Sequence, residues 1–382
     1  MPWRPCPPGL DPAYVLRTRP VRRTVAPARK KAKPKLTGTV LGDVSEIPVG
    51  GGAIYTAAKV VVTQPTTCSD APRREPRMSG VGSLMLLDTA SLYYRAFFGV
   101  PETVRAPDGT PVNAIRGLLD MISRLVRARH PSQLVACLDA DWRPAFRVEA
   151  VPSYKAHRLA ADGRSEETPP GLAVQIPVIE EVLHASGLAV AGQPGYEADD
   201  VMGTLAARSS VPVDVVTGDR DLFQLVDDGR GVRVIYTVRG LLNMDVIDEA
   251  AVTAKYDIPG RAYADFAALR GDPSDGLPGV PGVGEKTAGA LIRRFGTIEG
   301  ITTALDAGHG GFPRGSRDKL EKARDYLDVA LSVVRVAHDA PLPDVDGTLP
   351  AVPPDAARLK ELGERWGLGS SLTRFVTAVC QA

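Results

Sequence analysis

Short hydrophobic runs recur along residues 84–236, and several of them end close to an aspartate. The runs cover residues 84–88, 134–139, 188–191, 213–217 and 232–236, and helical patterns fill the intervals between them. Continuous apolar runs of this length are typical of parallel strands that are buried on both faces. Strands separated by helices in this order predict a doubly wound α/β sheet.

The helices expected between these strands follow the spacing of the apolar residues. We expect helices around Tyr93–Phe98, Val112–Arg129, Leu172–Ser186 and Ala198–Arg208. In the second of these, apolar residues recur every three or four positions, which places them on one helix face.

After about residue 245 the pattern becomes mainly helical. A glycine-rich stretch, Leu277–Ala288, interrupts it, and further helices are expected over Leu320–Val334 and Ala356–Trp366. Two helices joined by a glycine-rich turn can present backbone N–H groups and a helix N-terminus to a phosphate. We therefore divide the chain into a tail over residues 1–78, an α/β core over 79–250, a helix-hairpin-helix subdomain over 251–320, and C-terminal helices over 321–382 that pack on the core.

Composition adds a difference in charge along the chain. The 382 residues suffice for two or three domains, and the 44% hydrophobic and 24% charged content is ordinary for a globular protein. Residues 1–77 carry 14 Lys and Arg against 5 Asp and Glu, whereas the remainder carries 32 against 40. We expect the basic, proline-rich tail to be disordered, with Met78 or Met85 as alternative starts of the native chain. An acidic body that binds a polyanion needs cations and a local basic strip.

The cysteines and the N-terminus bear on location. Cys6, Cys68, Cys137 and Cys380 are scattered without CxxC pairs, so they predict neither a disulfide framework nor a zinc site. The N-terminus lacks the apolar core of a signal peptide, and the stretch 53–62 is too short to cross a membrane. We therefore expect a cytoplasmic protein that does not bind a membrane.

Acidic residues gather near the ends of the predicted strands and in two later motifs. They are Asp88, Asp139, Glu197, Asp199, Asp200, Asp219, Asp221, Asp272 and Asp275. A single aspartate after a strand is most often a helix N-cap or a solvated loop end. Open parallel sheets, however, place ligands beyond the carboxyl ends of their strands, and acids gathered there repel one another unless divalent cations lie among them. Oxygen ligands suit Mg²⁺ or Mn²⁺, so the pattern indicates metal-dependent phosphoryl transfer.

Several short motifs, in this order along the chain, resemble those of the 5′-nuclease family. They are Asp88 with Tyr94-Arg95, Tyr154-Lys155, Tyr196–Asp200, Thr217–Leu222 and Gly271–Asp275, and Leu277–Ala288 looks like the family's helix-hairpin-helix. The family includes flap endonucleases and the 5′→3′ exonuclease domain of bacterial DNA polymerase I. The similarity covers about Leu84 to Phe375, and no polymerase region follows. The resemblance implies a PIN-like fold and a stand-alone bacterial 5′→3′ exonuclease.

The resemblance also implies two metal centres. Asp88, Asp139, Glu197 and Asp199 would belong mainly to the first, and Asp219, Asp221, Asp272 and Asp275 to the second, with Asp200 between them. In such a pair, one ion activates the attacking water and the other stabilises the leaving oxygen. Lys155 and Arg158 would stabilise the charge of the transition state from the base of a helical arch. The residues alone leave a solvated basic loop as an equal alternative for this segment.

The remaining candidates concern DNA binding. By resemblance Tyr94 stacks on a base beside the cleaved bond, although a core aromatic is a serious alternative. Arg143 and Arg147 are candidates for phosphate contacts, and Arg147 can equally pair with a local acid.

The hairpin residues Gly279, Gly282, Gly284, Lys286 and Thr287 are expected to hold a DNA phosphate without reading base identity. Family members also hold a monovalent cation, often K⁺, in this turn. One departure from the family is Gly276, where many relatives have asparagine, and we expect altered loop geometry there rather than lost activity.

The expected substrate is therefore DNA with a 5′ end or a 5′ flap, cleaved during replication and repair. Two alternatives stay open. An RNase with a similar acidic core would not need the hairpin, and a DNA-binding scaffold with a degenerate metal site would not need the complete set of acids.

Overall fold

The computed structural model describes residues 52–55, 60–63, 82–242 and 244–380. The chain falls into two units, residues 1–80 and 81–382. In the first unit, β1 (Gly52–Tyr55) pairs antiparallel with β2 (Val60–Thr63). The disorder expected for the tail, residues 1–78, otherwise concerns residues outside the described ones.

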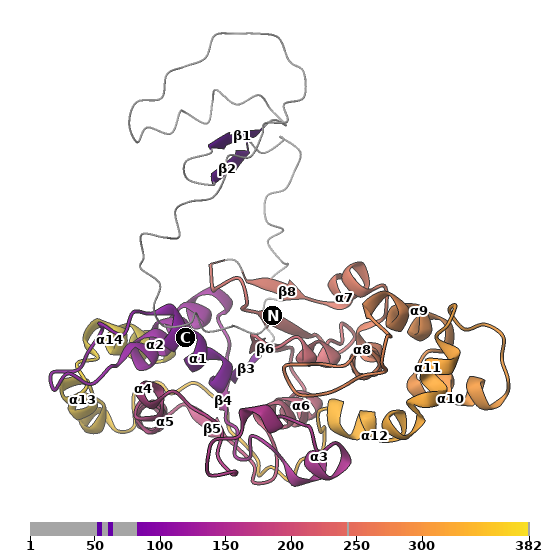
Figure 1. Cartoon of the computed structure of the whole chain (residues 1–382). Coiled ribbons are helices and arrows are strands. Elements are labelled where there is room, and N and C mark those ends of the chain that lie inside the picture. Colours follow the sequence, from indigo (N-terminus) through magenta and orange to yellow (C-terminus); the bar gives the residue numbers. More distant parts are fainter. Residues whose placement is uncertain (1–51, 56–59, 64–81, 243, 381–382) are drawn as a thin grey trace. The chain divides into compact units, whose positions relative to one another are not determined.

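Six strands of the described part of the second unit form one sheet (Figure 1). They are β3 (Leu84–Asp88), β4 (Gln133–Cys137), β5 (Ala189–Ala191), β6 (Val213–Thr217), β7 (Val232–Tyr236) and β8 (Asp245–Ile247). Their order is β5-β4-β3-β6-β7-β8, and all are parallel to their neighbours except β8, which runs antiparallel to β7. The chain moves outward from β3 on one side and from β6 on the other. In open α/β sheets, such a switch point leaves a crevice at the carboxyl ends of the two central strands.

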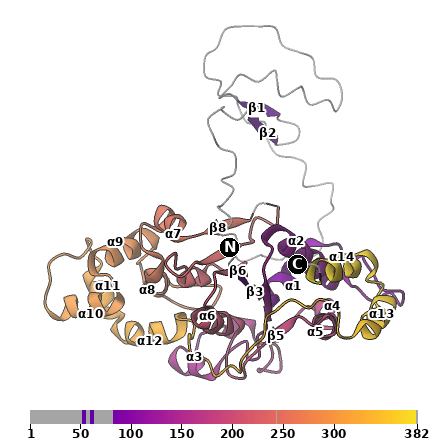
Figure 2. The same cartoon turned by 180° about the vertical axis from the view of Figure 1, so that it is seen from behind.

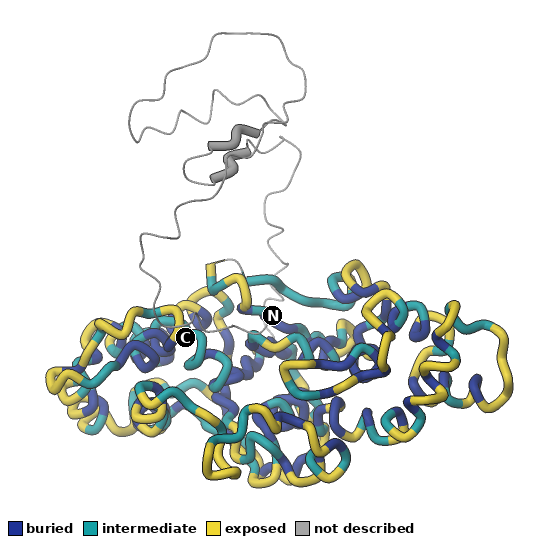
Figure 3. The backbone as a smooth tube through the Cα atoms, viewed as in Figure 1, coloured by how far each residue is buried: buried dark blue, intermediate teal, exposed yellow. Residues whose placement is uncertain are grey.

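Helices cover both faces of this sheet, which explains the unbroken hydrophobic runs of its strands. In the central strand β3, Leu84 and Leu86 pack into the core on one face, whereas Met85 and Leu87 pack into the core on the other. Every residue of β3 is buried, whereas the residues of the edge strand β8 are only partly buried, so burial is deepest at the centre of the sheet (Figure 3). The predicted doubly wound, mostly parallel sheet is therefore confirmed.

The helices divide between the two cores. On the face of Met85 and Leu87 lie α1 (Thr89–Gly99), α2 (Asn113–Arg129), α5 (Ile176–Ser186), α13 (Ala356–Arg365) and α14 (Gly369–Val379). The other core takes in α6 (Ala198–Arg208), α7 (Glu249–Tyr256), α8 (Tyr263–Arg270), α9 (Glu285–Phe295), α10 (Ile298–Asp306), α11 (Arg317–Lys322) and α12 (Arg324–Val334). Two short helices, α3 (Ala145–Ala150) and α4 (Pro170–Ala173), lie in the connections. Seen from either side, α13 and α14 lie at one end of the unit and α9 to α11 at the other (Figure 2).

Several details differ from the sequence prediction. The helix expected over Leu320–Val334 is divided into α11 and α12. The helix expected over Leu172–Ser186 is broken into α4 and α5, because Pro177 near the start of α5 has no N–H for a continuous helix. Gln175 lies at the break between α4 and α5. Its side chain is buried and accepts hydrogen bonds from the N–H groups of Ala114 and Ile115 at the start of α2. The edge strand β8 and the helix α14, which packs along α2, were not predicted.

The helix-hairpin-helix consists of α8, the turn over residues 271–284, and α9. Two glycines close its turn. Gly271 and Gly279 both have positive φ, and a Cβ atom on Gly271 would lie 2.7 Å from the backbone nitrogen of Gly279. Among the described residues, no helix is long and apolar enough to cross a membrane.

Candidate active site

The end of the central strand β3 contributes the first acid of the site. Asp88 is the last residue of β3 and caps α1, because its Oδ1 accepts a hydrogen bond from Ser91 N at 3.0 Å. Its Oδ2 accepts a hydrogen bond from Thr217 Oγ1 at 2.7 Å, at the end of the neighbouring strand β6. One carboxylate therefore serves as a helix cap and also lies at the switch point of the sheet.

The N-terminus of α6 brings further acids to the same place. Asp139, two residues beyond β4, accepts a hydrogen bond from Ala198 N at 2.8 Å, which fixes the start of α6 beside the sheet. Glu197 is the N-cap of this helix, and Asp199 lies in its first turn. A helix N-terminus stabilises such negative charges.

Burial and mutual repulsion disturb the ionisation of these acids. Burial raises the pKa of Asp88 and of Glu197 to about 7, and the nearby charge of Asp139 contributes to both shifts. Burial also raises the pKa of Asp199 well above its usual range, and the charges of Asp219 and Asp88 add to this. Burial in the first place, and repulsion between the acids in the second, therefore disfavour their ionised state in the protein alone.

A second set of acids follows β6 and α8. Asp219 accepts a hydrogen bond from Asp221 N at 2.8 Å, and Asp272 accepts one from Arg220 at 2.8 Å. Burial raises the pKa of Asp221 well above its usual range, with added repulsion from Asp219 and Asp272. The pKa of Asp272 is lowered despite its burial, because Ser274 and Arg220 donate hydrogen bonds to it.

The donor set fits a hard divalent cation by its chemistry. Glu197, Asp199, Asp221 and Asp275 line one small cavity of about 20 Å³ together with Tyr154 and neighbouring residues. This space accommodates a particle of about the size of a water molecule. No three acidic, histidine or cysteine side chains of the described residues converge closely enough in this structure to hold an ion as they stand. The fit therefore consists of oxygen donors, mutual repulsion and a shared cavity rather than of a completed coordination shell.

Lys155 is the basic residue that lies among the acids. Its Nζ donates a hydrogen bond to Glu197 Oε2 at 2.5 Å, and the hydroxyl of Tyr154 donates to Glu197 Oε1 at 2.7 Å. The Lys155 backbone has a φ of 47°, which is uncommon for a residue with a Cβ, and its N–H donates to the carbonyl of Asp275 at 2.8 Å. The strained backbone and the buried ion pair place this ammonium group at the acids.

Gly276, the departure from the family, explains how Lys155 is held. Its φ is 70°, and a Cβ atom there would lie only 2.2 Å from the carbonyl oxygen of Ser153. The glycine therefore lets the loop of Asp272 and Asp275 lie directly against the segment of Lys155.

Arg158 and Tyr94 lie at the edge of the acid cluster, around an open hollow of about 340 Å³ that His157, Glu166 and Glu167 also line. Arg158 donates to Asp275 Oδ1 at 2.8 Å and lies 3.7 Å from Glu166. Tyr94 is half-buried, and its hydroxyl lies 3.3 Å from Thr168 Oγ1. Its ring lies beside Tyr93, with 5.3 Å between the centroids, so both the stacking role and the packing role stay compatible with its position.

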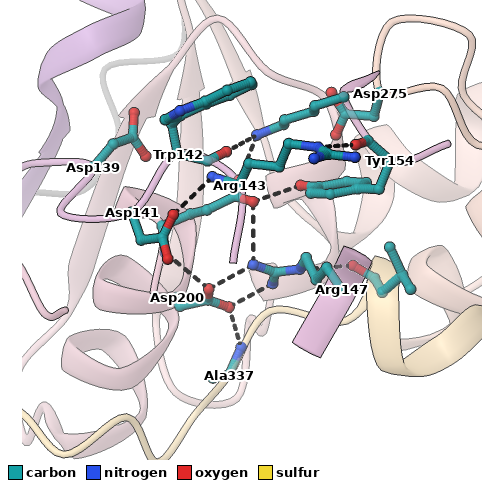
Figure 4. A network of polar contacts seen from close by, with 12 residues as sticks. Asp139, Asp141, Trp142, Arg143, Arg147, Tyr154, Asp200, Asp275 and Ala337 are labelled. Atoms are coloured by element: carbon teal, nitrogen blue, oxygen red, sulfur yellow. Dashed lines mark hydrogen bonds and ion pairs between the residues drawn. The ribbon is translucent and has the colours of Figure 1, made fainter. Parts of the chain in front are cut away.

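Asp200 differs from its expected role, and Arg147 takes the second of its two expected ones. Asp200 is fully buried, and its two oxygens accept hydrogen bonds from the Arg147 guanidinium, both at 2.7 Å (Figure 4). Further donors to Asp200 are the backbone N–H groups of Glu197 and Ala337. Asp200 is held by a bidentate pair with arginine, and unlike Glu197 and Asp199 it does not line the small cavity, so its position indicates a structural role rather than that of a metal ligand.

Arg147 contacts this acid instead of DNA. It is 3% exposed and also donates to the carbonyls of Val333 and Arg335 after α12, so of its two alternatives the structure shows the pairing with a local acid. Arg143 is engaged as well, because it donates to the carbonyl of Tyr154 at 2.6 Å (Figure 4). It also donates to the carbonyl of Pro152 at 3.0 Å. These two hydrogen bonds hold the backbone on the N-terminal side of Lys155 in place.

The hairpin residues lie in the turn between α8 and α9, with Gly279 against the end of α8 and the others at or near the start of α9. Gly284 caps the helix and has open space where a side chain would lie, and Lys286 is exposed in the first turn. Thr287 is half-buried in the same turn. Gly279 and Gly282 have positive φ, and the Gly282 carbonyl accepts a hydrogen bond from Lys319 Nζ at 2.9 Å.

Several site residues were not predicted from the sequence. Thr217 binds Asp88, Tyr154 binds Glu197, and Arg220 and Arg270 contact Asp272. Thr217, Tyr154 and Arg220 lie inside the recognised motifs and could have been found there. Arg270 directly precedes a motif, and no local pattern marks it as a partner of the acids.

The comparisons with known proteins agree with this geometry. A doubly wound sheet with acids at its switch point and a helix-hairpin-helix beside it defines a metal-dependent nuclease. Residues 83–257 match the family model of the 5′-3′ exonuclease N-terminal resolvase-like domain, and residues 258–357 match that of the 5′-3′ exonuclease C-terminal SAM fold. The chain belongs to the 5′-3′ exonuclease family.

Individual relatives support the same assignment. A 5′-3′ exonuclease of Streptomyces coelicolor is 59% identical over 299 residues, which cover 77% of this chain and 99% of the relative. A 5′-3′ exonuclease of Mycobacterium tuberculosis is 49% identical over 309 residues, which cover 78% of this chain and 97% of the relative. The fold is similar to that of the phage T5 D15 flap endonuclease, solved as a pseudo-enzyme-product complex with DNA and metal ions. That similarity has a TM-score of 0.51 at 16% identity and covers 78% of this chain and 98% of that one.

Proposed function

We propose that this nuclease hydrolyses phosphodiester bonds of DNA at free 5′ ends and at 5′ flaps, with two divalent ions, Mg²⁺ or Mn²⁺. The observation that carries the proposal is the set of buried and half-buried acids at the β3–β6 switch point, whose pKa values are raised by burial and by one another. Such acids become stable as anions when cations bind among them. The roles we infer for the enzyme are in DNA replication and repair, in the cytoplasm.

The ligands of the two ions would come from the two sets of acids. Asp88, Asp139, Glu197 and Asp199 form the first set, and Asp219, Asp221, Asp272 and Asp275 form the second. Bound divalent ions supply an activated water and stabilise the leaving oxygen. The protein contributes by holding the acids at fixed places, through the Thr217 hydroxyl on Asp88 and the Ala198 N–H on Asp139.

Lys155 has two tasks in this proposal. In the present structure its ammonium group neutralises Glu197, within a buried pair. When cations take over that role, the ammonium group becomes available to stabilise the negative charge that develops on the phosphate. Arg158, at the entrance of the cluster, adds a second positive charge on the same side.

DNA would be held by backbone groups and by an aromatic ring rather than through base edges. The open N-terminus of α9, with Gly284 and Lys286, offers N–H groups and a positive charge to one phosphate of the duplex. Tyr94 borders the hollow next to the acids and would stack on a base there. Such contacts select the shape of the DNA and not its sequence.

A potassium ion at the hairpin is a further part of the proposal. Lys319 already donates to the Gly282 carbonyl, so an ion at that oxygen would have to displace the ammonium group. Comparing DNA binding in potassium chloride with binding in tetramethylammonium chloride at equal ionic strength tests this part.

Product mapping on a 5′-labelled flap substrate tests the function. We expect Mg²⁺-dependent cleavage near the flap junction, and we expect Asp219→Asn to lose at least about a hundredfold in rate, since even indirect partners of a metal cost 10- to 100-fold. An RNA hairpin of matched length serves as the second substrate. Cleavage of the RNA alone would identify an RNase, and binding of the flap without cleavage would identify a scaffold.

A further inference from the structure

Unsatisfied polar atoms gather around Asp221 at the second set of acids. In the described part of the chain, four buried side-chain atoms lack a hydrogen-bond partner, and three of them are Asp221 Oδ1, Tyr263 Oη and Arg270 Nη1. Arg270 Nη2 lies 3.9 Å from Asp221 Oδ1. Burial raises the pKa of Tyr263, and the charge of Asp221 adds to this rise, as expected for close neighbours. Buried polar atoms without partners are rare, so an unpartnered oxygen of Asp221 together with unpartnered atoms on Arg270 and Tyr263 calls for an explanation.

Arg270 is fixed in place as the last residue of α8. Its Nε donates to the carbonyl of Gly271 at 3.1 Å, and its guanidinium lies 5.4 Å from the ring centroid of Phe266. Its Nη2 lies 3.5 Å from Asp272 Oδ2, and its side chain is only 10% exposed. One largely buried positive charge therefore lies close to both Asp221 and Asp272, two of the acids proposed for one metal centre.

The contacts of Arg270 are long for a paired arginine. Asp272 Oδ2 has a shorter bond, of 2.8 Å, from Arg220, and Arg270 leaves one nitrogen unpaired. Arginine–carboxylate pairs of full strength have distances near 2.8 Å and use two nitrogens. Arg270 thus neutralises the acids through one long hydrogen bond to Asp272 and no hydrogen bond to Asp221.

We propose that Arg270 is a built-in counter-ion of the second set of acids and sets the affinity of the second divalent ion. Without metal, its charge stabilises Asp221 and Asp272 as anions. A divalent ion bound to the same oxygens is repelled by this guanidinium at close range, in a part of the protein that screens charge poorly. The enzyme therefore binds its second ion more weakly than the acids alone would allow, and Arg270 acts as a positioning residue. This inference rests on the proposed two-ion function.

Calorimetric titration of the full chain with MnCl₂, in the absence of DNA, tests the inference. We expect Arg270→Gln to bind the weaker Mn²⁺ ion about tenfold more tightly than the native protein, because one repulsive charge is gone. Arg270→Lys keeps the charge and should titrate like the native protein. Arg324→Gln, which removes a charge paired with Asp306 on the surface, is the matched control and should not change Mn²⁺ binding.

Thermal unfolding gives a second measurement that does not depend on activity. In EDTA, Arg270→Gln should melt at a lower temperature than the native protein, and its gain in Tm on addition of Mn²⁺ should be larger. If Arg270→Gln does not fold, Arg270→Met retains the contact with Phe266 and replaces it in both measurements.

The possible failures are distinguishable. Equal Mn²⁺ affinity of the native protein and Arg270→Gln, or tighter binding by Arg270→Lys to the same extent, overturns the counter-ion role and leaves the nuclease function intact. A native protein that neither binds Mn²⁺ nor cleaves the flap overturns both.

Discussion

In the proposed function, the acids at the sheet edge and the hairpin before α9 act on the same DNA in opposite ways. At the sheet edge, function depends on charges that the fold buries and crowds, with pKa values raised for Asp88 and Glu197 to about 7. At the hairpin it depends on backbone shape, with positive φ at Gly279 and Gly282 and an exposed Lys286.

This difference between the two regions predicts that stability and function are coupled at the acids but not at the hairpin. Buried charges cost folding free energy until a cation binds, so changes at the sheet edge should alter stability, pH dependence and cleavage together. The exposed Lys286 contributes little to the free energy of unfolding, because the turn is held by its backbone. Changes of this side chain should therefore alter only the affinity for DNA.

The largest effect is expected for Lys155→Ala. The change removes the positive charge from Glu197 and from the transition state, and a loss of about 10²- to 10³-fold in single-turnover rate is typical for one such stabilising group. DNA binding, measured by fluorescence anisotropy in Ca²⁺, should weaken far less. Equal losses in rate and in binding would place Lys155 among the DNA contacts and break the contrast with the hairpin.

Arg147→Ala tests whether the buried ion pair of Arg147 and Asp200 stabilises the fold. The change leaves Asp200 buried without its partner, so we expect a loss of about 3–5 kcal/mol in the free energy of unfolding, measured with urea. Arg324→Ala, which breaks the exposed pair with Asp306, is the control and should change stability little. A stable Arg147→Ala protein with weakened DNA binding would restore Arg147 to the DNA interface.

The raised pKa values predict how stability depends on pH. A carboxyl group with a raised pKa in the folded state binds protons that the unfolded chain has released, so stability falls as pH rises from about 4 to about 7. In EDTA, Tm should therefore be lower at about pH 8 than at about pH 5, and Asp88→Asn should reduce this difference. Mn²⁺ should reduce it too, since it favours the ionised acids. A difference unchanged by both would show that other groups dominate.

The smallest effect is expected at the hairpin. Lys286→Ala should weaken binding of flap DNA a few-fold and reduce the salt dependence of binding by about one unit, with no change in Tm or single-turnover rate. Lys360→Ala, on α13 at the other end of the unit, serves as the control (Figure 1). A change in Tm for Lys286→Ala would contradict the separation of stability and function at this site.

The strongest sequence predictions concerned segments whose pattern is local. Val213–Thr217 and Val232–Tyr236 are strands and Ala198–Arg208 is a helix within the same bounds as expected. Each of these segments has an apolar pattern from which its secondary structure can be predicted without knowledge of residues distant in the chain. The short edge strand β8 has no such pattern, and α14 is stabilised by α2, which lies more than 200 positions earlier.

The different roles of two neighbouring acids could not be predicted from the sequence. Asp199 and Asp200 are adjacent and chemically identical, yet Asp199 faces the shared cavity and Asp200 is bound by Arg147. Helix geometry turns consecutive residues about 100° apart, so their surroundings differ completely. Which one meets an arginine is decided by α3 and by the segment after α12.

By itself the sequence determined the alternation of strands and helices, the glycines of the hairpin and the presence of enough acids for a metal centre. These follow from local spacing and from residue chemistry. Only the tertiary structure decided three pairings: Asp200 forms an ion pair with Arg147, Lys155 forms one with Glu197, and Arg270 lies close to Asp221. Such pairings join residues that are distant in the chain, and the energy of a buried charge depends on which groups the fold places around it.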